Sequence, residues 1–210
     1  MPARDGQENA VSSDLSRLTV REQLAEFRRL VLLNPYIGKI LRGAVCLDLP
    51  GWYLTAGCLF QTVWNALSGR DPAAGIRDYD LFYFDDTNLS WEAEDLTIRR
   101  AAEVFADVGV GVEVRNEARV HLWYERKFGV PCSSHRSSEA AIDSFAATTC
   151  CYGVRLVGDE LEVYAPHGFG DLFGFVLRPN PVLAPREVYE NKARRWSAEW
   201  PKLAVMRWPA

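Results

Sequence analysis

The chain has 210 residues, of which 48% are hydrophobic and 25% are charged, and its formal net charge is −4. This is the composition of an ordinary globular protein, and the length suits one core better than two full domains. The negative charge argues against a broad surface that wraps nucleic acid, and the absence of a run of about 18 apolar residues argues against a membrane span.

The first residues lack the apolar segment of a secretory signal. We expect a disordered tail over 1–17 and a single domain over 18–210. The five cysteines are an odd number without a CxxC pair, which indicates neither a disulfide framework nor a zinc site. Reduced, mostly buried thiols in a cytoplasmic protein are expected instead.

Two amphipathic helices are predicted at the start of the domain. Thr19 and Glu22 form a capping box, and apolar residues at helical spacing follow over about 20–33. Asn34 and Pro35 then start a second helix, because asparagine caps helices well and proline suits the first turn.

Strands and helices alternate in the middle of the chain. The predicted strands cover 52–57, 79–84, 110–116 and 119–124. The helices between them cover 58–70 and 94–109, and Gly109 closes the second as a C-terminal glycine.

The last third of the chain begins with a loop rich in proline and serine over 128–138. A hairpin over 150–166 turns at Gly158-Asp159, and a final helix starts at Arg186. The order of elements predicts an α/β (α+β) domain: a sheet flanked by helices, with an N-terminal helical pair and a C-terminal hairpin and helix.

Asp78 and Asp80 stand out at the start of the aromatic-rich strand. Residues two apart in a strand share a face, so the two carboxylates lie about 7 Å apart and repel each other. A divalent cation relieves this repulsion, and ligands that are all oxygen favour Mg²⁺ or Mn²⁺. The alternative is that Asp78 caps a turn after Gly75 and Asp80 pairs with an arginine such as Arg77.

The surroundings of these aspartates strengthen the metal interpretation. Gly57 and Cys58 lie where a strand gives way to a helix, and the start of a helix attracts phosphate. On the next strand, the neighbours of Glu113 are apolar and point the other way, so Glu113 is placed to join the aspartates.

This pattern resembles the nucleotidyltransferase fold of the DNA polymerase beta superfamily. There, a glycine followed by a small residue opens a helix, and two aspartates with a third acid hold two metal ions. The matching residues are Gly57-Cys58, Asp78-Tyr79-Asp80 and Glu113. The chain is also similar to a bacterial family of small nucleotidyltransferase-like proteins, from about Leu54 to Leu203, through runs such as RDYDLFYFD and VEVRNEARVHLW.

The resemblance implies transfer of a nucleoside monophosphate from an NTP to an unknown acceptor. Asp78, Asp80 and Glu113 would be both the metal ligands and the catalytic residues, with Glu113 taking the acceptor's proton. Gly57, Cys58, Asn116 and Arg119 would bind the nucleotide. Arg119 has an equally good alternative, which is to neutralise a buried carboxylate.

The sequence departs from the expected pattern at two positions. Cys58 stands where active members of the superfamily usually carry glycine or serine, and a thiol is a poorer hydrogen-bond donor. An Asn-Gln-Ala-Arg run is expected after the third acid, and here Glu117 replaces the glutamine.

Other polar residues carry weaker signals. His121, His135 and His167 are scattered without metal-ligand spacing, and Asp171 is expected to cap a short helix. The C-terminal segment from Arg186 has more basic than acidic residues, which would attract a triphosphate or an RNA end, but such a face is more often only solvated.

Two further functions compete with nucleotidyl transfer. A module that binds a nucleotide or metabolite without catalysis is favoured by Cys58. A metal-dependent nucleotide-sugar glycosyltransferase would use Asp85 and Asp86 after the apolar run, but it leaves Asp78, Asp80 and Gly57 unexplained.

Overall fold

The computed structural model describes residues 15–209. The expected tail lies outside this range up to residue 14, and the backbone carbonyls of Leu15 and Ser16 accept hydrogen bonds from the side chain of Gln23. The α-helices are α2 (Val20–Val31), α3 (Pro35–Leu47), α4 (Gly57–Leu67), α5 (Trp91–Val104), α6 (Tyr124–Phe128), α7 (Ser138–Ile142), α8 (Gly170–Phe173) and α9 (Arg186–Glu199).

A mixed sheet forms the centre of the domain. Its strands have the order β3-β2-β1-β4-β5, in which β2 and β3 are parallel and the other neighbours antiparallel. They are β1 (Tyr53–Thr55), β2 (Tyr79–Tyr83), β3 (Val112–Asn116), β4 (Gly153–Val157) and β5 (Glu160–Tyr164). Two short strands, β6 (Val176–Leu177) and β7 (Ala204–Val205), pair separately. The predicted mixed sheet flanked by helices is confirmed.

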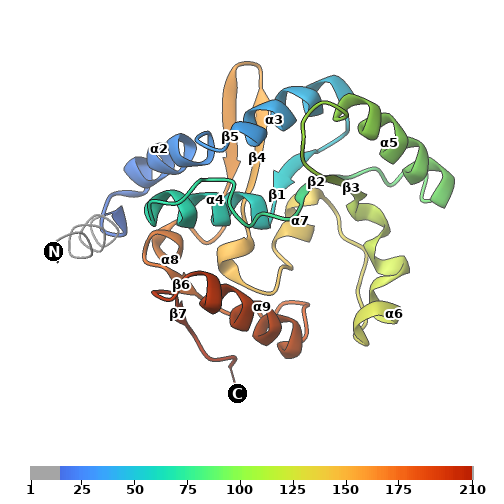
Figure 1. Ribbon diagram of the computed structural model, residues 1–210. Coiled ribbons are helices and arrows are strands. Elements are labelled where there is room, and N and C mark those ends of the chain that lie inside the picture. Colours follow the sequence, from blue (N-terminus) through green and yellow to red (C-terminus); the bar gives the residue numbers. More distant parts are fainter. Residues whose placement is uncertain (1–14, 210) are drawn as a thin grey trace, which may run out of the picture.

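The two faces of the sheet are covered differently. Tyr79, Leu81 and Tyr83 of β2 belong to the main core, which they share with α3 and α4. Phe82 belongs to a smaller cluster on the opposite face, with Tyr53 of β1 and Ile142 of α7. In Figure 1, α3 and α5 lie above β1, β2 and β3, and α9 lies near the bottom of the view. The second face is therefore only partly covered, and Asp80 lies on it.

The predicted helix starts in the N-terminal half agree with the structure. Thr19 and Glu22 form both hydrogen bonds of the capping box, and the Asn34 side chain accepts from the backbone N–H of Tyr36. Helix α5 begins earlier than predicted, because Ser90 caps it at Ala93. It also ends before Gly109, which lies in the turn that leads to β3.

The strand predicted over 119–124 is wrong. After β3 the chain forms a 3-10 helix, η1 (Glu117–Leu122), which leads into α6. The reason is Asn116, whose side-chain oxygen accepts from the N–H of Ala118 at 3.2 Å and so turns the chain out of the sheet. A second 3-10 helix, η2 (Thr148–Cys150), precedes β4.

The cap predicted at Asp171 is also wrong. The N-cap of α8 is Phe169, and Asp171 lies in the first turn of the helix. Its two carboxylate oxygens accept from Arg178 at 2.7 and 3.0 Å, so this carboxylate holds α8 to the segment around β6.

No single helix within 15–209 is long and apolar enough to cross a membrane. Helices α2 and α3 meet the criteria of length and composition only together, as a pair bent by 94°.

Candidate functional site

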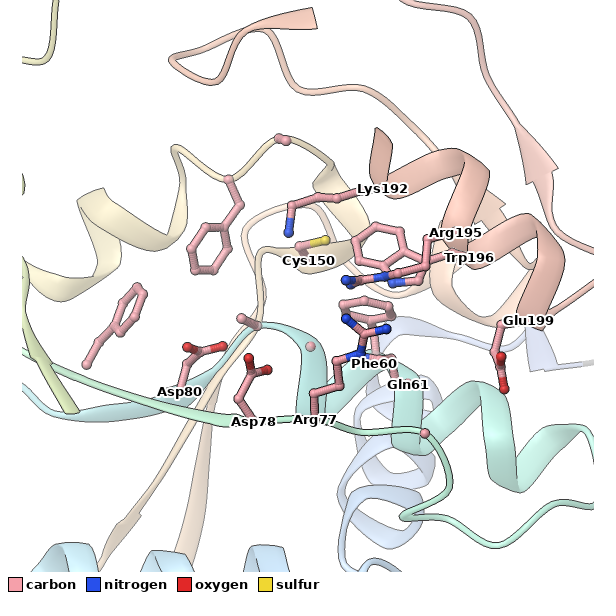
Figure 2. Close-up of a pocket in the computed structure, with 16 residues that line it drawn as sticks. Phe60, Gln61, Arg77, Asp78, Asp80, Cys150, Lys192, Arg195, Trp196 and Glu199 are labelled. Atoms are coloured by element: carbon pink, nitrogen blue, oxygen red, sulfur yellow. The ribbon is translucent and has the colours of Figure 1, made fainter. Parts of the chain in front are cut away.

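A cavity of about 400 Å³ lies where α4 begins, between the start of β2 and helix α9. Asp78 and Asp80 line one side of it, and both carboxylates point into it in Figure 2. Lys192 and Arg195 of α9 face them from the opposite side. The cavity therefore combines a pair of acids with a group of cations.

The carboxylates of Asp78 and Asp80 form no ion pair within the described chain. Asp80 is half-buried, and its pKa is raised to about 7 by burial and by the neighbouring charges of Asp78 and Glu113, while Lys192 and Arg115 oppose the shift. Neither aspartate forms an ion pair with another residue of the described chain, so the alternative of an Asp80–Arg77 pair is not observed. Two oxygen donors with uncompensated charge are a set that fits Mg²⁺ or Mn²⁺.

Glu113 is close to this pair without pointing into the same cavity. It lies directly opposite Asp80 in the parallel register of β2 and β3. Its carboxylate is exposed and 3.6 Å from Arg115, and it lines a second cavity that adjoins the first. Between residues 15 and 209, no three carboxylate, histidine or cysteine side chains form a ready metal-binding group. Of the three predicted acids, Asp78 and Asp80 therefore line the same cavity, and Glu113 lies beside them on the neighbouring strand.

The start of α4 has an unusual backbone. Ala56, its N-cap residue, has φ 61° and ψ −133°, a conformation that suits glycine and is strained for other residues. Gly57 follows as the first helical residue and lines the cavity, whereas the buried Cys58 thiol donates to the carbonyl of Thr55 at 3.2 Å. Gly57, rather than Cys58, therefore lines the cavity at the start of this helix.

Asn116 and Arg119 lie away from both cavities. The side chain of Asn116 exchanges hydrogen bonds with the backbone of Asp85, at 3.0 and 2.8 Å. Arg119 pairs with Glu94 of α5 and donates to the carbonyl of Leu89 at 3.0 Å. The alternative for Arg119, neutralisation of a buried carboxylate, is the arrangement observed.

The acids of the glycosyltransferase alternative are absent from the lining of both cavities. The carboxylate of Asp85 accepts from the backbone and the hydroxyl of Thr87, at 2.9 and 2.6 Å, so it stabilises a turn. Asp86 is exposed. This arrangement does not support a sugar-nucleotide site at these residues.

Arg77, Lys192 and Arg195 complete the first cavity, and none of them was predicted as a site residue. Lys192 and Arg195 lie 5.3 and 5.6 Å from the ring of Trp196. Within the described chain, none of the three cations has an ion-pair partner. The excess of basic residues after Arg186 was the sequence signal that pointed to two of them.

Comparison with known proteins gives the family and the fold. A family model described as nucleotidyltransferase matches residues 42–205. The fold is similar to that of a protein whose NMR structure is described as revealing a CCA-adding enzyme head domain. The TM-score is 0.69 and the sequence identity 24%, over 92% of this chain and 100% of that one. Among curated proteins, no match was found.

Proposed function

Because the chain belongs to the nucleotidyltransferase family, we propose that it transfers a nucleoside monophosphate from an NTP to an acceptor, with Mg²⁺ or Mn²⁺ as cofactor. One observation carries the proposal: the unpaired acids Asp78 and Asp80 face unpaired cations across the cavity in which α4 begins. This is the charge pattern that a metal-bound triphosphate requires, because the metal needs anions and the phosphates need cations.

The triphosphate is bound by the basic side of the cavity. Helix α4 begins at this cavity without a side-chain cap, so its first backbone N–H groups are available to a phosphate. Arg77, Lys192 and Arg195 supply positive charge for the β- and γ-phosphates. These cations also stabilise the negative charge that the departing pyrophosphate gains.

The acidic side holds the metal. Asp78 and Asp80 would provide the first ligands, and Glu113, opposite Asp80 on the neighbouring strand, would be the third acid for a second ion. When bound, the ions neutralise charge on the α-phosphate and on the attacking and departing oxygens. Glu113, which lines the neighbouring cavity, accepts the proton of the acceptor's hydroxyl group.

The alternative of a binding module without catalysis was favoured by Cys58, taken as a weak contact to phosphate. This thiol is buried and donates to the carbonyl of Thr55, whereas Gly57 lines the cavity, so Cys58 does not count against transfer. The description of the similar NMR structure suggests an RNA end as acceptor, and a small hydroxyl compound is the other candidate.

The proposal is tested by titrating the four ribonucleoside triphosphates, with and without Mg²⁺, against three proteins. These are the wild type, Asp80→Asn and the control Asp86→Asn, which changes an exposed acid outside the cavity. We expect binding that needs Mg²⁺ in the wild type and the control and is lost in Asp80→Asn. Pyrophosphate release with candidate acceptors then measures transfer. Equal binding by all three proteins would contradict the site.

A further inference from the structure

A second cavity of about 240 Å³ adjoins the first one. The two share part of their walls, because Asp80, Phe82, Phe145 and Lys192 line both. A molecule in the second cavity therefore comes within reach of the same aspartate that faces the first. The two cavities are halves of one site, separated by the side chains on β2.

The walls of the second cavity are mainly apolar and aromatic. Trp123, Tyr124 and Phe128, from the end of η1 and from α6, form one wall. The rings of Tyr124 and Phe128 pack against each other with centroids 4.6 Å apart, and Trp123 lies 6.0 Å from Tyr124. A dry cavity of about 150 Å³ holds a benzene ring, so this space holds a single substituted ring.

Glu117 is the most buried charged residue of this cavity. It is only 4% exposed, and its carboxyl group makes no hydrogen bond with any residue between 15 and 209. A ligand in the cavity can therefore supply the donor that the protein does not. The other charged groups around the cavity are Asp80, Glu113, Arg115 and Lys192.

The position of the second cavity matches that of an attacking group. The cations that would hold pyrophosphate lie in the first cavity, whereas Glu113 lines the second one. An in-line displacement needs the nucleophile on the side of the α-phosphate away from the leaving group.

We propose that the second cavity binds the acceptor, a small hydroxyl compound with one ring and an amino group that donates to Glu117. The role of acceptor rests on the proposed function. The hydroxyl oxygen bonds to the α-phosphorus, the bond from that phosphorus to pyrophosphate breaks, and the hydroxyl proton passes to Glu113. The ring lies against Trp123, and Glu117 selects the amine.

Two tryptophans allow each cavity to be tested separately by NMR. The indole N–H signal of Trp123 reports on the second cavity and that of Trp196 on the first, and the exposed Trp91 of α5 serves as the control signal. The probes are benzylamine, benzyl alcohol and benzoate, which share a ring and differ in charge. Mg-ATP is titrated into the same samples.

At pH 8.5, above the pKa of Glu117, we expect benzylamine to shift the signal of Trp123 and to bind about tenfold more tightly than benzoate, because a charge-assisted hydrogen bond to Glu117 is lost with the anion. Glu117→Gln keeps the shape and should weaken benzylamine about tenfold, with benzyl alcohol and Mg-ATP unchanged.

Equal affinities for the three probes, or no response of Trp123, would overturn this inference. A response of Trp123 to a short single-stranded RNA but to none of the ring probes would assign the cavity to an RNA end and also overturn it. Benzylamine binding without any Mg-ATP response at Trp196 would instead count against the proposed function and leave the ring site standing.

Discussion

The side-chain amide of Asn34 donates to the hydroxyl of Tyr79 at 3.0 Å, and Tyr79 stands between the two aspartates of the site. The same amide donates to the hydroxyl of Thr62 in α4 at 3.0 Å. One buried residue at the start of α3 thus links the helix that begins at the cavity to the strand that carries the acids.

Asn34→Ala should lower the free energy of unfolding by about 2 kcal/mol, because it removes a helix cap and the hydrogen bonds to Tyr79 and Thr62, of which only Thr62 keeps another partner, the carbonyl of Cys58. Chemical denaturation measures the change. The control is Asn191→Ala, at an exposed position of α9, where we expect a change within about 0.5 kcal/mol. Similar losses in both variants would mean that the network around Tyr79 has no special role.

Ala56→Gly should stabilise the protein by about 1 kcal/mol, because Ala56 has a positive φ that glycine adopts without strain. Ala66→Gly, inside the same helix, should instead cost about 1 kcal/mol. Thermal unfolding of the two variants compares them directly. Destabilisation of the same size at both positions would show that the backbone at Ala56 is not strained.

Glu117→Gln should change stability in a way that depends on pH. Burial and, to a smaller extent, the charge of Asp80 raise the pKa of Glu117 to about 8, and Arg115 opposes the shift. Between its ordinary value of 4.5 and about 8, the folded protein holds a proton that the unfolded chain releases, so wild-type stability falls as the pH rises through this window.

Glutamine does not titrate, so the Glu117→Gln variant should not lose stability as the pH rises. It should match the wild type near pH 5 and be more stable above pH 8, by about 2 kcal/mol. Urea unfolding at both pH values measures the difference. A constant difference between the proteins would contradict burial of a protonated Glu117.

Arg195→Ala should weaken Mg-ATP binding about tenfold, because it removes a charge-assisted contact to phosphate. Arg194→Ala is the matched control, since Arg194 is the next residue of α9, is exposed and bonds to Asn191. Calorimetry at two salt concentrations measures both. A loss of affinity in Arg194→Ala equal to that in Arg195→Ala would indicate a diffuse effect of charge.

Mg²⁺ should raise the melting temperature of the wild type at pH 8 by a few degrees, because it binds between carboxylates that repel each other in the folded protein. EDTA should reverse the shift, and Asp80→Asn should not show it. The exposed Asp86→Asn variant should respond like the wild type. A metal-induced shift that persists in Asp80→Asn would place the cation elsewhere.

The sequence by itself determined those features of this protein that depend on short-range geometry. The alternation of side chains along a strand put Asp78 and Asp80 on one face and Tyr79, Leu81 and Tyr83 on the other, as the structure has them. The caps at Thr19 and Asn34 and the β4–β5 hairpin follow from equally local rules. These rules act over a few residues, so the features could be predicted without knowing any contact between distant parts of the chain.

Only the tertiary structure decided the features that depend on partners far along the chain. Arg119 pairs with Glu94 because α5 packs beside β3, and η1 replaces a strand because Asn116 holds both Asp85 and the N–H of Ala118. Lys192 and Arg195 reach the cavity because Trp196, on the same helix, packs against Phe60 of α4. Burial of Glu117 likewise arises from the aromatic wall around it, and no local pattern in the sequence encodes that contact.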